Sequence, residues 1–125
     1  MKRSLLFLSI LLVTLTFSSC KKDKDDDKVV KYEVVNSDGI VFSIEYTGAD
    51  GNVAYDDNPA TNWSKEVRPN SFPFTAKMQV DFENGDVSQH SYILNIKVNG
   101  EVKATTPIVV GNSETTLGHL QYVVE

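Results

Sequence analysis

Three segments of the chain alternate apolar and polar side chains with a period of two, and this alternation constrains the fold more than any other feature. The apolar positions are Ile40-Phe42-Ile44-Tyr46, every second residue from Phe72 to Phe82, and Tyr92-Leu94-Ile96-Val98. Successive side chains of a strand point to opposite faces of the sheet, so each segment predicts a strand with one buried face. No window keeps a 3.6-residue period. We therefore expect no helix longer than a turn or two after the N-terminal segment.

Short polar turns separate these segments and suggest how the strands connect. Asn84-Gly85 follows the second segment and Asn99-Gly100 follows the third. Asn-Gly suits a two-residue type I′ hairpin turn because both positions adopt positive φ at little cost. We therefore predict a three-stranded antiparallel meander over about residues 72–110. The Asn-Ser-Asp-Gly stretch at 36–39 predicts another hairpin, between strands at 30–34 and 40–46.

The remaining strand signals complete an all-β domain. Residues 117–124 predict the last strand, with Leu120, Tyr122 and Val124 directed inward. Pro107 has no N–H to donate, so we place it at a sheet edge or a break. About seven short strands predict a small antiparallel β-sandwich of immunoglobulin-like kind, and a small barrel is the alternative.

The N-terminus carries the three zones of a secretory signal. Lys2 and Arg3 precede an apolar run over residues 5–17, and Ser18 and Ser19 then precede Cys20. The run has about thirteen residues, fewer than the roughly 20 that span a bilayer. We therefore interpret residues 1–19 as a cleaved signal peptide. An uncleaved N-terminal anchor is the alternative.

The stretch Phe17-Ser18-Ser19-Cys20 resembles the lipobox of bacterial lipoproteins, although Phe17 stands where leucine is commonest. The resemblance implies a diacylglyceryl group on the Cys20 thiol, cleavage before Cys20, and a fatty-acyl group such as palmitate on the new amine. Two or three acyl chains anchor a protein durably, whereas one does so only marginally. Cys20 is the only cysteine, so the chain forms no internal disulfide.

A purely polar stretch follows the cysteine. Residues 21–28 are all Lys or Asp, which cannot pack into a core, so we predict that residues 20–28 are the lipidated cysteine and a solvated tether. The stretch resembles the Lys/Asp-rich signal of Bacteroidota lipoproteins that are sent to the cell surface. The resemblance implies anchoring in the outer membrane. The cell surface is then one location, and the periplasmic face is the other.

The predicted domain at residues 29–125 is acidic. It holds six Lys or Arg and thirteen Asp or Glu, a net charge of about −7. An acidic domain without a basic cluster is a poor partner for nucleic acid or anionic lipid. We therefore expect no nucleic-acid binding, and we expect the membrane contact to be made by the lipid.

Four segments of the domain carry a second resemblance. They are YEVV at 32–35, FSIEYTGADG at 42–51, NWSK at 62–65 and ILNIKVNGEV at 93–102. Their order resembles the MmpS-type domain, a membrane-anchored β-sandwich that works beside large transport proteins in exporting lipids and siderophores. The mycobacterial cysteines of the later strands are absent, and Leu94 stands where one would fit. The resemblance implies the sandwich fold more than it implies a transport role.

Catalytic motifs are missing from the sequence. His90 and His119 are the only histidines, and neither belongs to a metal-ligand or triad spacing. There is no Gly-x-Ser-x-Gly elbow and no glycine-rich phosphate loop. We therefore predict a protein that is not an enzyme and that needs no cofactor.

Two features remain as candidate binding residues. Trp63 is the only tryptophan, and it is either a core side chain between the sheets or, with Tyr55, a surface aromatic for ligand or partner contact. Oxygen-bearing side chains gather between residues 50 and 58, and these could hold Ca²⁺, although Gly51 comes too soon for an EF-hand. The same residues are typical of ordinary turns. The calcium ligands would be Asp50, Asn52, Asp56 and Asp57.

Three functions fit these features. The first is a non-enzymatic accessory or interaction lipoprotein that presents an edge strand or loop to another envelope protein, such as an exporter. The second is a surface module that binds a glycan or other small ligand through Tyr55 and Trp63, and it requires an exposed Trp63. The third is a structural or adhesive envelope component. The sequence favours the first over the second and does not separate the first from the third.

Overall fold

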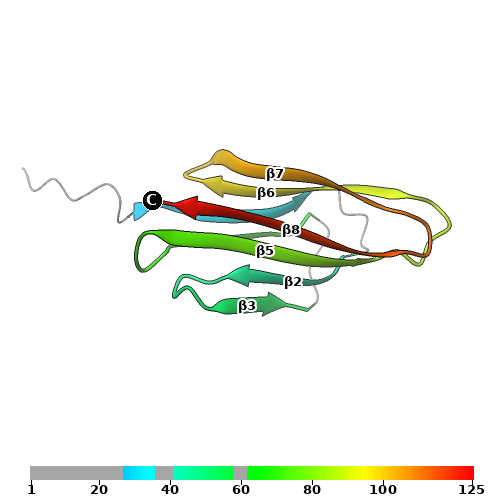
Figure 1. The fold of residues 1–125 in the computed structure, drawn as a ribbon, viewed down its shortest axis with the longest axis horizontal. Helices are drawn as coiled ribbons and strands as arrows, with labels where there is room; N and C mark the ends of the chain where they lie inside the picture. Colours follow the sequence, from blue (N-terminus) through cyan, green and yellow to red (C-terminus); the bar gives the residue numbers. More distant parts are fainter. Residues whose placement is uncertain (1–26, 36–40, 58–61) are drawn as a thin grey trace, which may run out of the picture.

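The structure, a computed structural model, describes residues 27–35, 41–57 and 62–125 and arranges them as two antiparallel sheets of four strands each (Figure 1). The strands are β1 (Val30–Val35), β2 (Val41–Thr47), β3 (Val53–Asp56), β4 (Ser64–Val67), β5 (Phe74–Glu83), β6 (His90–Val98), β7 (Glu101–Val110) and β8 (Thr115–Val124). Sheet A has the order β4-β1-β6-β7, and sheet B has the order β3-β2-β5-β8. The predicted β-sandwich is confirmed. The described residues form eight strands where about seven were expected, in two sheets and not in a closed barrel.

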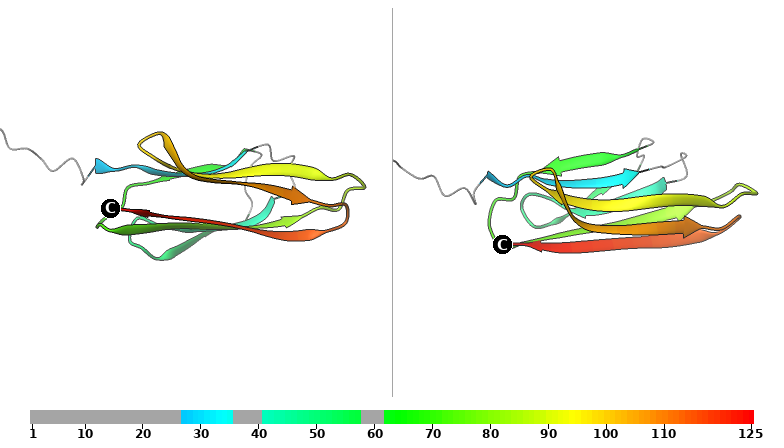
Figure 2. Two further views of the ribbon diagram at one scale, coloured as in Figure 1. Left: turned by 45° about the horizontal axis from the view of Figure 1, so that its top comes forward. Right: turned by 90° about the horizontal axis from the view of Figure 1, so that it is seen from above.

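Figure 2 shows the sheets as two layers whose strands run along the long axis of the molecule. One end of this axis holds the start of β1, the end of β8 and the turns β2–β3, β4–β5 and β6–β7. We call this end the tether pole, because the predicted tether leads into β1 there. The crossing loops β5–β6 and β7–β8 lie at the opposite end, which we call the far pole.

Among the described residues, two pairs of consecutive strands lie in the same sheet and form hairpins. They are β2–β3 in sheet B and β6–β7 in sheet A. The β6–β7 turn has φ of 50° at Asn99 and 82° at Gly100, so the prediction of a two-residue turn with both residues at positive φ is confirmed. Pro107 lies in β7, an edge strand of sheet A, as expected for a residue without an N–H donor.

The predicted meander over residues 72–110 is wrong, because β5 belongs to sheet B and β6 to sheet A. The chain crosses between the sheets at residues 84–89. The hairpin predicted between β1 and β2 is also wrong, since β1 pairs with β4 and β6, whereas β2 pairs with β3 and β5. Its turn at 36–39 lies outside the described residues.

Asn84 explains why the first Asn-Gly pair does not form a hairpin. Its side chain is buried, and its amide nitrogen donates to the carbonyls of Ser88 at 2.8 Å and Gly111 at 2.9 Å. Its side-chain oxygen accepts from the N–H of Asp86 at 2.9 Å. Gly85 is not among the described glycines with positive φ. Asn84 therefore acts as a buried anchor that joins the two loops of the far pole.

The core lies between the sheets and consists of the predicted inward positions. Side chains from β1, β2, β5, β6 and β8 are almost fully buried, and Leu120 and Tyr122 pack against them partly buried. Gly118 lies on the inner face of β8, where a Cβ would come within 3.0 Å of Leu94 and 3.1 Å of Phe82. The predicted inward residue Ile40 and the side chain of Phe42 lie outside the description.

Aromatic side chains pack between the sheets on the side of the sandwich where β3 and β4 are the edge strands. The ring of Tyr46 lies 5.5 Å from that of Tyr32 and 5.7 Å from that of Trp63, centroid to centroid. The Tyr32 hydroxyl, from sheet A, donates to the carbonyl of Thr47 in sheet B at 2.9 Å. Burial raises the pKa of Tyr32 well above its usual range, although hydrogen bonds with Thr47 lower it in part. The hydroxyl therefore stays protonated and keeps its bond between the sheets.

Candidate binding surfaces

Trp63 lies in the core directly before β4, with 7% of its surface exposed. Its carbonyl accepts from the N–H of Val34 at 2.9 Å. Its indole Nε1 donates to Asp56 Oδ2 at 2.7 Å. The side chain is therefore placed as the core interpretation expects, and no exposed ring face is left for stacking on a ligand.

The proposed calcium ligands do not converge. Asp50 lies in the β2–β3 turn, where its two carboxylate oxygens accept from the backbone and side-chain amides of Asn52. These bonds lower the pKa of Asp50. Asp56 stands at the opposite end of β3 and binds the Trp63 indole, and Asp57 is exposed just beyond. No group of three or more acidic, histidine or cysteine side chains that could hold a metal occurs among the described residues.

The two histidines lie apart on different sheets. His90 opens β6 in sheet A, with Nε2 3.4 Å from Asp86 Oδ2 and a side chain that is 13% exposed. His119 projects from the outer face of β8 in sheet B. They do not form a shared site.

The outer face of sheet B carries a row of polar side chains that crosses all four strands. Tyr55 lies opposite Glu45, Glu45 opposite Gln79, and Gln79 opposite His119. We call these four residues the sheet B row. Tyr55, which the sequence suggested as a contact residue, is 63% exposed. Since neighbouring strands lie about 4.8 Å apart, the row is roughly 14 Å long.

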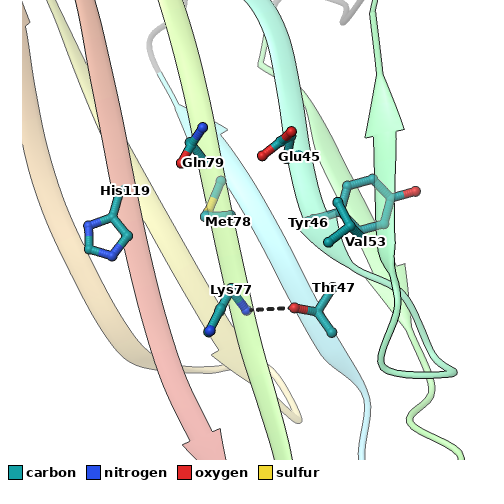
Figure 3. A pocket seen from close by; sticks show the side chains of 8 residues that line it. All are labelled: Glu45, Tyr46, Thr47, Val53, Lys77, Met78, Gln79 and His119. Carbon is teal, nitrogen blue, oxygen red and sulfur yellow. Dashed lines mark hydrogen bonds between the residues drawn. The ribbon is translucent and has the colours of Figure 1, made fainter.

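A shallow hollow of about 140 Å³ lies against this row (Figure 3). Its rim includes the polar side chains of Glu45, Lys77, Gln79 and His119, which come from β2, β5 and β8. Val53 of β3 borders it at the edge of the sheet. Thr47 lies at its lower side in Figure 3 and accepts from the backbone N–H of Lys77 at 3.1 Å.

The polar groups around the hollow are not paired with one another. Within the described part of the chain, no hydrogen bond or ion pair joins the side chain of Glu45, Lys77, Gln79 or His119 to another residue. Carboxylate, ammonium, amide and imidazole groups thus face solvent side by side. The hydrogen-bonding capacity of this surface is available to a ligand.

The outer face of sheet A differs because Glu33 is paired with three neighbouring polar side chains. Glu33 lies 3.2 Å from Lys31 Nζ and 3.0 Å from Lys97 Nζ, and it accepts from the Asn95 amide at 3.3 Å. Partial burial raises the pKa of Glu33, but these hydrogen bonds lower it by more, and the net result is a pKa below the usual value. We call these four residues the charge cluster.

Apolar side chains lie next to the charge cluster, toward the far pole. Val35 pairs with Ile93, and Ile93 pairs with Pro107, so the three side chains form a line across β1, β6 and β7. Val109 follows on the same face of β7 and is 53% exposed, and Ile93 is 37% exposed. We call these four residues the apolar row. A contiguous exposed apolar row is typical of an interaction surface.

The end of the predicted tether contacts the domain. Asp27 Oδ1 lies 3.3 Å from Arg68 Nη1. Lys28 donates to the carbonyl of Glu125, and its Nζ lies 5.3 Å from the centroid of the Phe72 ring. The rest of the tether, together with Cys20 and the predicted signal at 1–19, lies outside the described residues. Within residues 27–35, 41–57 and 62–125, no helix is long and apolar enough to cross a membrane.

Comparison with known proteins identifies no family for this chain. No protein-family model matches the chain, and no curated protein matches it.

Sequence reasoning found Tyr55 but missed its neighbours in the sheet B row. Glu45, Gln79 and His119 belong to three strands that are separated along the chain. Their positions in the alternating pattern mark them as outward-facing. Only the pairing of β2, β5 and β8 brings them into one line.

Proposed function

We propose that this protein is a lipid-anchored lipoprotein of the cell envelope, whose sandwich is a non-enzymatic interaction domain for another envelope protein. The observation that carries the interaction role is the apolar row on sheet A. Exposed apolar side chains on a flat sheet gain free energy when a partner covers them.

The composition of this face supports a protein partner. The apolar row is bordered by the charge cluster, in which the other three side chains contact Glu33 at 3.0 to 3.3 Å. An apolar centre with a polar border is the usual anatomy of a protein–protein interface. Because the border is already satisfied internally, a partner that covers the row need not compensate buried, unpaired charges.

The anchor would be the lipidated Cys20 that the lipobox resemblance implies. Residues 21–26 then span at most roughly 20 Å between the lipidated cysteine and the domain. Asp27 and Lys28 meet the domain at the tether pole, and the strands run from there along the long axis. The apolar row would therefore stand away from the membrane, within reach of another envelope protein. The MmpS-type resemblance suggests a component of an export complex as that protein.

Replacing the cysteine tests the anchor. Cys20→Ala in the native host should abolish incorporation of labelled palmitate and release the domain from the membrane fraction. Ser18→Ala, which keeps a small residue in the lipobox, is the matched control and should leave labelling intact. Labelling that survives Cys20→Ala would overturn the anchor.

Site-specific crosslinking tests the interaction. A photo-crosslinking amino acid at Val109 should give one defined protein adduct in intact cells, identified by mass spectrometry. Ile93→Asp in the same protein should abolish this adduct, because it buries a charge in the middle of the apolar row. The control places the same crosslinker at Val123, on the outer face of sheet B, and should not give that adduct. Only monomer at Val109, or an adduct that persists with Ile93→Asp, would contradict the proposal.

A further inference from the structure

We propose that the outer face of sheet B binds a neutral oligosaccharide, on the side of the sandwich opposite the apolar row. The site consists of the sheet B row, Tyr55-Glu45-Gln79-His119, with Lys77 and the adjoining hollow. It is distinct from the protein contact proposed above and does not depend on it.

The shape of the site fits an extended ligand. The hollow measures about 140 Å³, below the roughly 300 Å³ at which enclosing pockets for small ligands begin. The row beside it crosses four strands and is roughly 14 Å long. A ligand would therefore lie along the face and touch several strands, as a chain of linked sugar rings can.

The chemistry of the row fits a polyol. A sugar hydroxyl both donates and accepts hydrogen bonds, and it can bond to the acceptor Glu45, the donor Lys77 and the dual amide of Gln79. These groups are unpaired among the described residues, unlike the charge cluster of sheet A. Binding would therefore add hydrogen bonds without breaking existing ones within the protein.

Charge favours a neutral ligand over an anionic one. Glu45 and Lys77 border the same hollow and carry opposite charges, so their fields largely cancel there. The surrounding domain has a net charge of about −7, which opposes the approach of a polyanion. A neutral sugar carries no charge, so the net charge of the domain does not oppose its approach.

Tyr55 supplies the apolar contact that the polar groups lack. Its ring lies at one end of the row and is 63% exposed, and Val53, 61% exposed, lies beside it on the same face of β3. The C–H face of a sugar ring can cover an exposed aromatic face while the hydroxyls at its rim stay hydrogen-bonded. Tyr55 is thus the stacking residue of the proposed site.

Binding can be measured with the full lipoprotein purified in detergent. The probes are maltohexaose, cellohexaose, xylohexaose and mannohexaose, titrated up to about 10 mM by isothermal calorimetry, a concentration that detects dissociation constants of about 1 mM. At least one probe should bind. Tyr55→Ala should weaken that binding about tenfold or more, and Tyr55→Phe should retain most of it, because the ring is kept. Gln79→Ala should also weaken it.

Val123→Ala is the matched control, because Val123 is an exposed apolar residue on the same face, outside the row. It should bind as the unchanged protein does, and circular dichroism should show that every variant is folded. The proposal is overturned if no probe binds, or if Tyr55→Ala binds as tightly as Val123→Ala. It is also overturned if a crosslinker at Tyr55 captures a defined protein in cells and the probes do not compete. No other protein is present in the calorimetry, so failure of the proposed protein contact would not affect its result.

Discussion

The indole Nε1 of Trp63 lies 2.7 Å from Asp56 Oδ2, and this hydrogen bond joins β3, an edge of sheet B, to the residue that precedes β4, an edge of sheet A. No backbone ladder joins the two sheets among the described strands, so this side-chain bond connects edges that strand pairing leaves separate. A carboxylate acceptor makes it stronger than a neutral hydrogen bond. Trp63 therefore connects the edge strands β3 and β4 through this hydrogen bond, and its side chain also fills part of the core.

Trp63→Phe should lower the free energy of unfolding by about 2 kcal/mol or more, because it removes this charge-assisted bond and part of the buried ring. Urea unfolding followed by circular dichroism measures the change. Tyr55→Phe is the control, since it removes a hydroxyl from an exposed aromatic, and it should change stability by less than about 0.5 kcal/mol. Equal stability of the two variants would show that the Trp63–Asp56 bond contributes nothing.

Asn84→Ala should destabilise the protein by about 2–3 kcal/mol, because it leaves the carbonyls of Ser88 and Gly111 without their donor. Besides this loss of global stability, the two far-pole loops should open locally more often. Hydrogen exchange should speed up in both far-pole loops, at residues 85–89 and 111–114. Asn112→Ala, an exposed asparagine in the second loop, should leave the exchange rates unchanged. Faster exchange in only one loop would disprove the joining role of Asn84.

Gly118→Val should destabilise the protein by about 1–3 kcal/mol through overpacking. A Cβ alone would already stand 3.0 Å from Leu94 and 3.1 Å from Phe82, and a valine adds two further methyl groups. Gly85→Ala is the matched control, because a Cβ there meets nothing within 4 Å and no positive φ is required. Thermal melting should separate the two variants, and a valine variant that melts like the Gly85 variant would refute the close approach.

Glu33→Gln should reduce stability in a pH-dependent way. The pKa of Glu33 is lowered in the folded protein, so its ionised form contributes stability above the unfolded pKa of about 4.5. That contribution is lost as the pH falls through the lower, folded pKa. The free energy of unfolding of the unchanged protein should therefore exceed that of Glu33→Gln by about 1 kcal/mol near pH 7, and the gap should close as the pH falls below about 4.5. Urea midpoints across this range measure it, and a constant gap would contradict the role of the charge cluster.

The strands and the core were predictable because burial follows a local rule. Alternation at Phe74 to Phe82 and at Tyr92 to Val98 reports which face of each strand is apolar, whatever the strand pairs with. The turn at Asn99-Gly100 was predictable for the same reason, since its left-handed backbone depends on those two residues alone.

The pairing of strands was not predictable, because it depends on distant partners. Asn84-Gly85 has the same two residues as Asn99-Gly100, yet Asn84 bonds to carbonyls of two separate loops and the chain changes sheet. For the same reason, most residues of the candidate site could not be predicted from the sequence. Tyr55 could be recognised as an aromatic near a turn, whereas Glu45, Gln79 and His119 become neighbours only through the register of β2, β5 and β8.

The sheet-changing connections also bear on how fast the chain can fold. Val30 pairs with Val98 in sheet A and Phe74 pairs with Val124 in sheet B, so neither sheet is complete until distant segments have met. Closing such long loops before any contact compensates for the lost entropy makes folding slow. A slowly folding chain stays unfolded for longer after synthesis, and an unfolded polypeptide can be threaded through a narrow secretion channel.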